Sequence, residues 1–334
     1  MSGKEEALKA LRRWCSQSQS RPRLCLNAQD LRGDGRLVVI AQAGDLAPLE
    51  AALSEAAAHG FSAAAVRPLS LRGLTALEIA LRGSAFEDLQ SALAPRRRDG
   101  LDLSLQPGRL GLCPPGLLVM DMDSTLVEQE GIDELAREVG VYEEVASVTE
   151  EAMRGRMDFD ESLRRRVACL KDAPQGIFQR VRARIRLTAG SRRMLAVLRR
   201  HGTRLALLSG GFQQLGAELA RDLHFDHFYA NRLEVRRGRL TGRLTGPIVN
   251  ASRKAELLGE LAARHDLRTA QTAALGDGAN DLPMLLTSGL GIAFCAKPKV
   301  RREALHCLDV RRLDAALYYM GFSDDEIYVN SQGF

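Results

Sequence analysis

The stretch LLVMDMDSTLVEQE, residues 117–130, decides the fold. Four apolar residues lead directly into Asp121 and Asp123, which are separated by one methionine. A short apolar run of this kind is typical of a buried strand. Two carboxylates at its end raise each other's cost of ionisation, so a fold accepts them for a metal ion, an acid–base pair or a nucleophile. The remaining sequence has to distinguish among these three uses.

Length and composition predict two domains and no membrane span. The chain has 334 residues, of which 45% are hydrophobic, which is long for one domain and apolar enough for ordinary cores. The longest apolar-looking stretch, 49–66, is interrupted by Glu50, Glu55 and His59. The N-terminus is charged and lacks the apolar core of a signal peptide. We therefore expect a cytoplasmic protein without membrane association.

Charge and cysteine content exclude further classes. The net charge of +5 is spread over both parts of the chain, and aromatic residues make up only 5% of it, so neither a basic patch nor a base-stacking surface is indicated. We expect no nucleic-acid partner. The six cysteines form no C-x-x-C pair, which favours reduced thiols over a zinc site or a disulfide framework.

The first third of the chain predicts a small α+β domain over residues 31–110. Its order is β-α-β-β-α-β, the ferredoxin-like split unit, with strands at 36–43, 61–67, 75–81 and 101–105 and helices at 46–59 and 84–93. Residues 1–30 are polar, and we expect an irregular, partly ordered extension there. Proline and glycine at 114–116 mark a linker.

A second domain is expected over residues 114–320, with a tail of unassigned role at 321–334. Predicted strands alternate with helices, which indicates a doubly wound parallel sheet; the strands are 117–120, 203–208, 226–230, 272–275 and 291–294. Residues 131–188 instead have helical periodicity and no good strand, so a helical-bundle insertion of about four helices is predicted. Residues 231–248 alternate like a hairpin.

Polar residues follow several of these strands, and the carboxyl ends of parallel strands meet at one edge of a sheet. Asp121 and Asp123 follow the first strand, and Asp277 follows the strand at 272–275. Together they form an all-oxygen set that suits Mg²⁺. Ser209 and Gly210 follow another strand and are predicted at a helix N-terminus, where amides favour a phosphate.

Lys254 completes this constellation. It is one of six lysines and opens a predicted helix on the same side of the sheet, where it can neutralise a phosphate oxygen. A metal ion, a lysine and an anion-binding turn around a carboxylate nucleophile indicate phosphoryl transfer. Each feature also has a purely structural interpretation as a turn, a cap or a solvated helix start. Those interpretations would have to hold independently at four places in the correct order.

The motifs also resemble a known family. DMDST, LLSGGF, the later lysine and GDGANDLPM resemble, in order, the four motifs of the haloacid dehalogenase superfamily of phosphatases. Within it, DMDSTLVEQEGIDELA, EEVASVTEEAMRGRMDFDESLRRRV, ANRL and AFCAKPKV are similar to the phosphoserine phosphatases. The resemblance covers about residues 114–310. The N-terminal unit resembles the ACT-like domain that precedes this catalytic domain in many bacterial members.

The resemblance implies roles for the aspartates. Asp121 corresponds to the nucleophile that becomes phosphorylated. Asp123 corresponds to the general acid/base that protonates the departing seryl oxygen and then activates water. Asp121, the main-chain carbonyl of Asp123, and Asp277 correspond to the ligands of Mg²⁺.

The resemblance also implies the phosphate and substrate contacts. Ser209, Gly210 and Lys254 correspond to phosphate-binding groups. Asn280 corresponds to a substrate contact, and Asp281 is expected to orient Lys254 from behind.

Substrate choice is expected to depend on two charged residues. Glu130 corresponds to the group that pairs with the serine ammonium, and Arg166 to the group that binds the serine carboxylate, for which guanidinium geometry is suited. Only the resemblance selects Arg166 from the run of three arginines at 164–166. The insertion would form a cap over the substrate. Phe159 and Met153 are candidates to line the closed pocket, although core packing explains them equally well.

The sequence therefore predicts Mg²⁺-dependent hydrolysis of O-phospho-L-serine to L-serine and phosphate through an aspartyl phosphate, the last step of serine biosynthesis. An alternative is a phosphatase or phosphotransferase of the same mechanism that acts on another small phosphomonoester. A third hypothesis, a regulatory amino-acid-binding protein with a relic second domain, is disfavoured by the intact set of catalytic residues. A homodimer is possible, and the N-terminal domain could bind serine, mediate dimer contacts or do neither.

Overall fold

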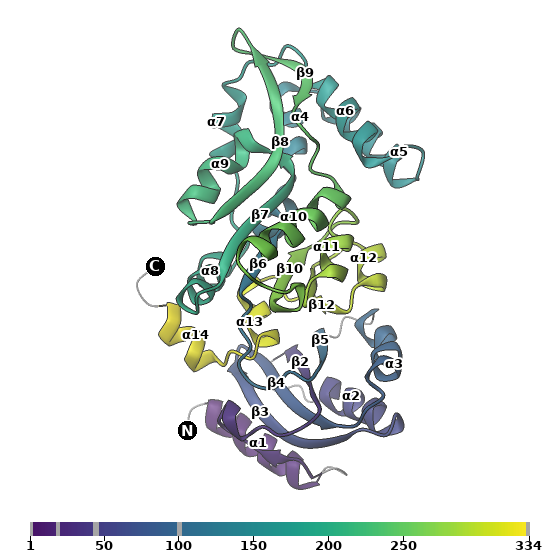
Figure 1. Cartoon of the computed structure of the whole chain (residues 1–334), viewed down its shortest axis with the longest axis vertical. Helices are drawn as coiled ribbons and strands as arrows, with labels where there is room; N and C mark the ends of the chain where they lie inside the picture. The colour runs from purple at the N-terminus through teal and green to yellow at the C-terminus, as the bar shows by residue number, and fades with distance from the viewer. Residues whose placement is uncertain (1–2, 18–20, 43–46, 99–101, 332–334) are drawn as a thin grey trace. The chain divides into compact units, whose positions relative to one another are not determined.

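The computed structural model describes residues 3–17, 21–42, 47–98 and 102–331, and it confirms the predicted α/β fold class (Figure 1). The chain divides into two compact units. The central unit comprises Gly116–Ser191 and Thr203–Gly291, and the terminal unit comprises Met1–Pro115, Arg192–Gly202 and Ile292–Phe334. The domain boundaries expected from the sequence stay a prediction.

The central unit contains a mostly parallel sheet. Its strands, in spatial order, are β10 (Thr272–Gly276), β6 (Leu117–Met120), β7 (Arg204–Phe212), β8 (His227–Arg236) and β9 (Arg239–Thr245). All are parallel neighbours except β9, which forms an antiparallel hairpin with β8. The four apolar residues of β6 are fully buried, and β6 is paired with a strand on each side. This strand therefore ends in the interior of the unit, where Asp121 begins the loop.

Helices connect the strands of this sheet. They are α9 (Gln213–Asp222), α10 (Ala251–Arg264) and α11 (Leu282–Thr287), with a 3₁₀ turn at Thr269–Gln271. Helix α8 (Ser191–Arg200) precedes β7 and lies largely in the terminal unit. The strand–helix alternation agrees with the predicted doubly wound topology.

Residues 131–188, called the cap below, form helices as predicted. These are α4 (Gly131–Val139), α5 (Tyr142–Met153), α6 (Phe159–Cys169) and α7 (Ile177–Arg182). Their apolar faces share one core, to which the hairpin contributes Leu233 and Leu240. The backbone of Leu240 exchanges hydrogen bonds with Asp172 and Ala173, each 2.9 Å from nitrogen to oxygen. The β8–β9 hairpin thus extends from the sheet to the cap helices and supports them (Figure 1).

The terminal unit contains the predicted β-α-β-β-α-β order. Its elements are β2 (Gly35–Gln42), α2 (Ala47–Ala58), β3 (Ser62–Arg72), β4 (Leu74–Arg82), α3 (Phe86–Arg98) and β5 (Asp102–Pro107). The strands lie in the order β3-β4-β2-β5 and are all antiparallel, which is the ferredoxin-like arrangement. On one side β1 (Arg23–Leu24) pairs with β3; on the other, β12 (His306–Leu308) joins β5 and β11 (Leu290–Phe294) joins β12.

The expectation of an irregular N-terminal extension was wrong for residues 3–17. They form α1 (Gly3–Gln17), whose Leu11 and Cys15 are buried in the core of the terminal unit. The spacing of Leu8, Leu11 and Cys15 already has the helical period, so the signal was present but was outweighed by the charged residues between. The C-terminal part adds α12 (Pro298–Glu303), α13 (Ala316–Tyr319) and α14 (Asp324–Ser331), with a 3₁₀ turn at Leu313–Ala315.

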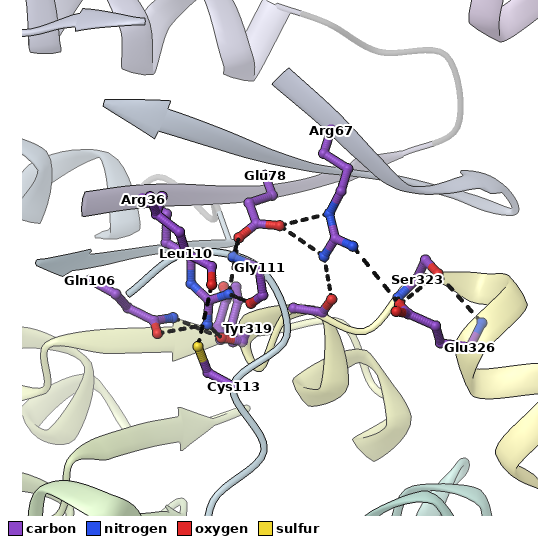
Figure 2. A network of polar contacts seen from close by, with 11 residues as sticks. Arg36, Arg67, Glu78, Gln106, Leu110, Gly111, Cys113, Tyr319, Ser323 and Glu326 are labelled. Atoms are coloured by element: carbon purple, nitrogen blue, oxygen red, sulfur yellow. Dashed lines mark hydrogen bonds and ion pairs between the residues drawn. The ribbon is translucent and has the colours of Figure 1, made fainter. Parts of the chain in front are cut away.

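A buried ionic network ties the strands of the terminal unit to its C-terminal segment (Figure 2). Glu78 on β4 is fully buried between two guanidiniums: Arg36 Nη1 lies 3.1 Å from Glu78 Oε1, and Arg67 Nε lies 2.9 Å from Oε2. Arg36 also donates to the carbonyl oxygen of Tyr319, and Arg67 to that of Gly321. Two buried cations therefore share the Glu78 carboxylate and fix the segment around residue 320, where Glu326 lies 4.0 Å from Arg67 as a second, partly exposed counter-charge.

We expect Glu78→Gln to lower the free energy of unfolding of the terminal unit by about 3–5 kcal/mol, because it leaves the buried Arg36 without a carboxylate partner and leaves Arg67 with only the more distant Glu326. The measurement is urea denaturation. The matched control is Glu87→Gln in α3, where an exposed glutamate of the same unit is changed and a shift within about 0.5 kcal/mol is expected. Equal effects of the two changes would contradict the importance of the network.

Candidate active site

Three aspartates come together where β6 and β10 end. Carboxylate oxygens of Asp121, Asp277 and Asp281 all lie within 4.8 Å of one another, and the three side chains are buried. Asp121 follows β6 and Asp277 follows β10, as the parallel pairing of these strands requires. The hydroxyl of Thr125 donates to Asp277 Oδ1 at 3.3 Å and links the two loops.

Lys254 neutralises part of this acidic cluster. It lies in the first turn of α10 and is fully buried, with its Nζ 2.8 Å from Asp121 Oδ1 and 2.7 Å from Asp281 Oδ1. Burial alone would lower the pKa of Lys254, but the attraction of the two carboxylates outweighs it and raises the pKa, so the amine stays charged. Asp281 Oδ2 accepts from the amide of Gly278 at 3.0 Å. Asp281 is thereby held in place to orient Lys254.

The turn after β6 brings Asp123 and Glu130 together. Ser124 has a φ of 55°, a left-handed conformation that side chains rarely adopt, and it reverses the chain within the buried turn. Its hydroxyl donates to Glu130 Oε1 at 2.9 Å. The amide of Gly131 donates to Asp123 Oδ1 at 2.9 Å. The first residues of the cap are thus tied to the turn that bears both aspartates.

Asp123 is suited to proton transfer. Burial, followed by the repulsion of the Glu130 carboxylate, raises the pKa of Asp123 to about 7. A carboxyl group with a pKa near the working pH can both donate and accept a proton. Asp121 differs because it lies against Lys254; burial and the neighbouring Asp281 nevertheless raise its pKa as well.

The stretch that is expected to bind phosphate differs from its predicted conformation. Residues 209–211 were expected at a helix N-terminus, but β7 continues to Phe212 and α9 begins only at Gln213. The helix dipole therefore does not act directly on Ser209. Instead the pairing of β7 with β8 is irregular after Ser209, whose hydroxyl accepts from the amide of Gly211 at 2.8 Å and lies 3.5 Å from Asp123 Oδ2.

Glycine is required at 211 because of Asp123. A Cβ on Gly211 would lie 2.3 Å from Asp123 Oδ2 and 3.0 Å from Ser209 Oγ, closer than such atoms approach each other. A Cβ on Gly210 would lie 3.2 Å from the ring of Phe159 and 3.6 Å from Asn280 Nδ2. The ring of Phe159, from the cap, and the amide of Asn280 therefore both face the Gly210 backbone.

The structure separates Arg166 from its two neighbours. The side chains of Arg164 and Arg165 are 63% and 54% exposed, whereas Arg166 is partly buried. Burial lowers the pKa of Arg166, and the carboxylates of Glu130, Asp133 and Asp123 oppose that shift in this order. Arg166 is therefore the arginine of this run that faces the acidic side of the site.

The two candidates for lining the pocket behave differently. Phe159 is partly buried, packs against the cap core and lies against Gly210. Met153 is 76% exposed at the end of α5. In this structure Phe159 contacts the site and Met153 does not line it.

Sequence reasoning assigned no role to Asn231, which the structure places beside the site. Asn231 is 1% exposed; its Nδ2 donates to the carbonyl oxygen of Gly210 at 2.8 Å, and its Oδ1 accepts from the amide of Val249 at 2.9 Å. It fixes the Gly210 backbone against the segment that leads into α10. The stretch ANRL, which contains Asn231, was noted only as part of the family resemblance, and no role was predicted for the asparagine.

The acidic cluster fits a hard divalent cation. Its donors are all oxygen atoms, and burial of several like charges in one place is compensated by a cation. Both oxygens of Asp281 are engaged, Oδ1 by Lys254 and Oδ2 by the amide of Gly278, whereas the contacts of Asp121 with Lys254 and with the amide of Met122 both use Oδ1. Asp121 and Asp277 are therefore the better candidate ligands for such an ion. The main-chain carbonyl of Asp123 was the third ligand expected from the sequence.

Comparison with known proteins identifies the class of protein. The family model of the haloacid dehalogenase-like hydrolases matches residues 118–286. The chain therefore belongs to the haloacid dehalogenase-like hydrolase family, as its motifs indicated. Among the residues that the structure describes, no helix is both long and apolar enough to cross a membrane.

Within this family, the chain is similar to proteins named phosphoserine phosphatase. The protein from Streptococcus thermophilus is 50% identical over 189 residues, which are 57% of this chain and 88% of that protein. The protein from Streptomyces coelicolor is 44% identical over 255 residues, covering 76% of this chain and 62% of that longer protein.

Solved structures agree with these relatives. A probable phosphoserine phosphatase from Vibrio cholerae has a TM-score of 0.69 at 31% identity and covers 99% of this chain and 95% of its own. A structure described as a phospho-aspartyl intermediate analogue of phosphoserine phosphatase has a TM-score of 0.59 at 41% identity. It covers 61% of this chain and 98% of its own.

We expect Gly211→Ala to reduce phosphatase turnover by about 100-fold or more, because its Cβ would displace the Asp123 carboxylate and a misplaced catalytic group costs on this order. The measurement is kcat together with a thermal melt. Gly259→Ala is the matched control: Gly259 lies inside α10 with open space around it, so this change should stabilise the helix slightly and leave kcat unchanged. A fully active Gly211→Ala protein would show that the close approach is not required.

Proposed function

We propose that this protein is a Mg²⁺-dependent phosphoserine phosphatase that hydrolyses O-phospho-L-serine to L-serine and phosphate, the last step of serine biosynthesis. One observation carries the proposal: the carboxylates of Asp121 and Asp123, the proposed nucleophile and proton donor, lie within one turn, with Lys254 against the first and Glu130 near the second. The relatives and structures described above support the same activity.

The first half of the reaction uses both aspartates of the turn. An Asp121 carboxylate oxygen attacks phosphorus while Asp123 donates its proton to the seryl oxygen as the phosphorus–oxygen bond breaks. The raised pKa of Asp123 means that this proton is available near neutral pH. The products of this step are free serine and the aspartyl phosphate on Asp121.

The second half restores the enzyme. Asp123, now ionised, takes a proton from water, the water oxygen attacks phosphorus, and the bond to the Asp121 oxygen breaks. Lys254 and the backbone of 209–211 balance the charge on the phosphoryl oxygens in both halves. A bound Mg²⁺ would supply further positive charge at the same oxygens.

The charges around the turn match the remainder of the substrate. Glu130 would pair with the ammonium group of serine and Arg166 with its carboxylate. Ser124 holds Glu130 in position through its hydroxyl, and the partial burial of Arg166 strengthens any ion pair it forms. A phosphomonoester that lacks either charge would leave one of these groups without its counterpart.

The proposal extends to the rest of the chain. We take residues 31–110 as an ACT-like domain and residues 114–320 as the phosphatase domain, in a cytoplasmic enzyme that could act as a homodimer. The ferredoxin-like strand order of β2 to β5 supports the first assignment.

The experiment that tests the proposed function is phosphate release from L-phosphoserine, phosphothreonine, phosphoethanolamine and a sugar phosphate. We expect a strong preference for L-phosphoserine and loss of activity when EDTA removes the divalent cation, because the acidic cluster then lacks its charge compensation. Re-addition of Mg²⁺ should restore it. Activity on the other esters alone would keep the mechanism and reject the substrate, whereas no hydrolysis of any ester would reject the enzyme function.

We expect Arg166→Ala to lower kcat/KM for phosphoserine by about 10- to 100-fold, because a charge-assisted hydrogen bond to the substrate carboxylate is worth ~1.5–3 kcal/mol. Hydrolysis of 4-nitrophenyl phosphate, which has no such carboxylate, should be spared. Arg165→Ala is the matched control, since Arg165 is exposed and pairs with Glu161 on the outer face of α6. Equal loss on both substrates would contradict the role assigned to Arg166.

A further inference from the structure

Asn250 joins two elements that carry different halves of the site. Its Oδ1 accepts from the amide of Arg253 at 3.1 Å and caps the N-terminus of α10. Its Nδ2 donates to Asp160 Oδ1 of the cap at 3.0 Å. Because the oxygen is assigned by a backbone donor and the nitrogen by a carboxylate, the orientation of the amide is determined on both sides.

On the α10 side, Asn250 fixes the position of Lys254. The carbonyl oxygen of Asn250 accepts from the amide of Lys254 at 3.0 Å, the first hydrogen bond of the helix. Val249, the preceding residue, is held by Asn231, which also holds Gly210. The segment before α10 is therefore fixed both to the backbone of Gly210 and to the helix turn that carries Lys254.

On the cap side, Asp160 lies in the first turn of α6, between Phe159 and the turns that lead to Arg166. Phe159 rests against Gly210, so this end of α6 lies over the phosphate-binding backbone. Arg166 is in the last turn of the same helix. Holding the first turn of α6 therefore sets the distance between Arg166 and the phosphate-binding groups.

We propose that Asn250 and Asp160 are positioning residues that clasp the cap to α10 and so set the spacing between the carboxylate-binding arginine and the phosphate-binding lysine. The inference rests on the proposed function. It identifies the contact that sets the distance between the carboxylate and phosphate groups that the enzyme accepts in its substrate. The clasp acts through Arg166, by holding α6 at a fixed distance from Lys254, and does not itself touch the substrate.

The charges around the clasp favour the amide of Asn250 as the main partner of Asp160. The other oxygen of Asp160 lies 3.8 Å from Arg164, whose side chain is 63% exposed. Exposed ion pairs at this distance contribute little, whereas a hydrogen bond to a carboxylate contributes more.

The test is to remove the amide group of Asn250 that donates to Asp160. Asn250→Asp keeps an oxygen that accepts from Arg253, so the cap of α10 is preserved, but it places a second carboxylate against Asp160. We expect the KM for phosphoserine to rise about tenfold, the loss of one charge-assisted hydrogen bond, with little change for 4-nitrophenyl phosphate. Amide hydrogen exchange in residues 159–169 should become faster.

The double variant Asn250→Asp with Asp160→Asn should restore both readouts, because an amide at 160 can now donate to the carboxylate at 250 and the net charge is that of the original protein. A variant that merely damages folding would not be rescued in this way. Arg164→Gln is the matched control on α6 and should change neither readout.

The outcomes separate this inference from the proposed function. Unchanged hydrogen exchange in Asn250→Asp, or a double variant that stays as impaired as the single one, overturns the clasp. An equal loss on both phosphate esters also overturns it, since Asn250 would then act on Lys254 and not on the cap. If the unaltered protein does not hydrolyse phosphoserine, the proposed function fails, and hydrogen exchange alone still decides whether the clasp exists.

Discussion

The contact of Lys254 with Asp121 and Asp281 is the interaction on which the remaining site depends. Three charged groups are buried here, and desolvation of each is unfavourable unless the others are in place. The parallel strands β6 and β10 end side by side, which brings Asp121 close to the loop that carries Asp281. Lys254, in the first turn of α10, lies between the two carboxylates. The Asp121 carboxylate, the proposed nucleophile, is thus held by the same contacts that allow its burial, which would reduce the reorganisation needed when phosphorus is attacked.

Around this centre, the backbone at Ser124 and Gly211 determines how closely the aspartates approach their neighbours. Ser124 reverses the chain with a left-handed backbone, and Gly211 allows the Asp123 carboxylate to approach where a Cβ would not fit. Two neighbouring aspartates consequently have different surroundings: one faces a lysine and the other faces Glu130. The different roles that we propose for these two aspartates follow from their different surroundings, as in other sites where one carboxyl group acts as nucleophile and its neighbour as acid.

The sequence could predict the parts that follow from local pattern. The run at 117–120 could be recognised as a buried strand, and the helical period of 131–188 as the cap, because burial and periodicity are properties of short segments. The residues that meet at the strand ends followed from the topology of a parallel sheet.

The extended conformation of Ser209 could not be predicted, because the sequence Ser-Gly-Gly fits a turn and a strand end equally well and tertiary contacts decide. Arg166 could be selected only by resemblance, since its burial depends on the packing of α6. The hydrogen bonds of Asn231 to Gly210 and Val249, and that of Asn250 to Asp160, could not be predicted, because these partners lie far away in the chain. Locally, Asn250 has only the character of a helix N-cap.

The Arg36–Glu78–Arg67 arrangement limits how this protein can diverge. Loss of Glu78 leaves Arg36 without a carboxylate partner and leaves Arg67 with only Glu326, 4.0 Å away, whereas loss of either arginine leaves Glu78 paired with the other one. Glu78 is therefore the residue of the three whose single replacement costs most. The carbonyl oxygen of Gly321 would need a new donor if Arg67 changed, whereas that of Tyr319 accepts from Gln106 as well as from Arg36.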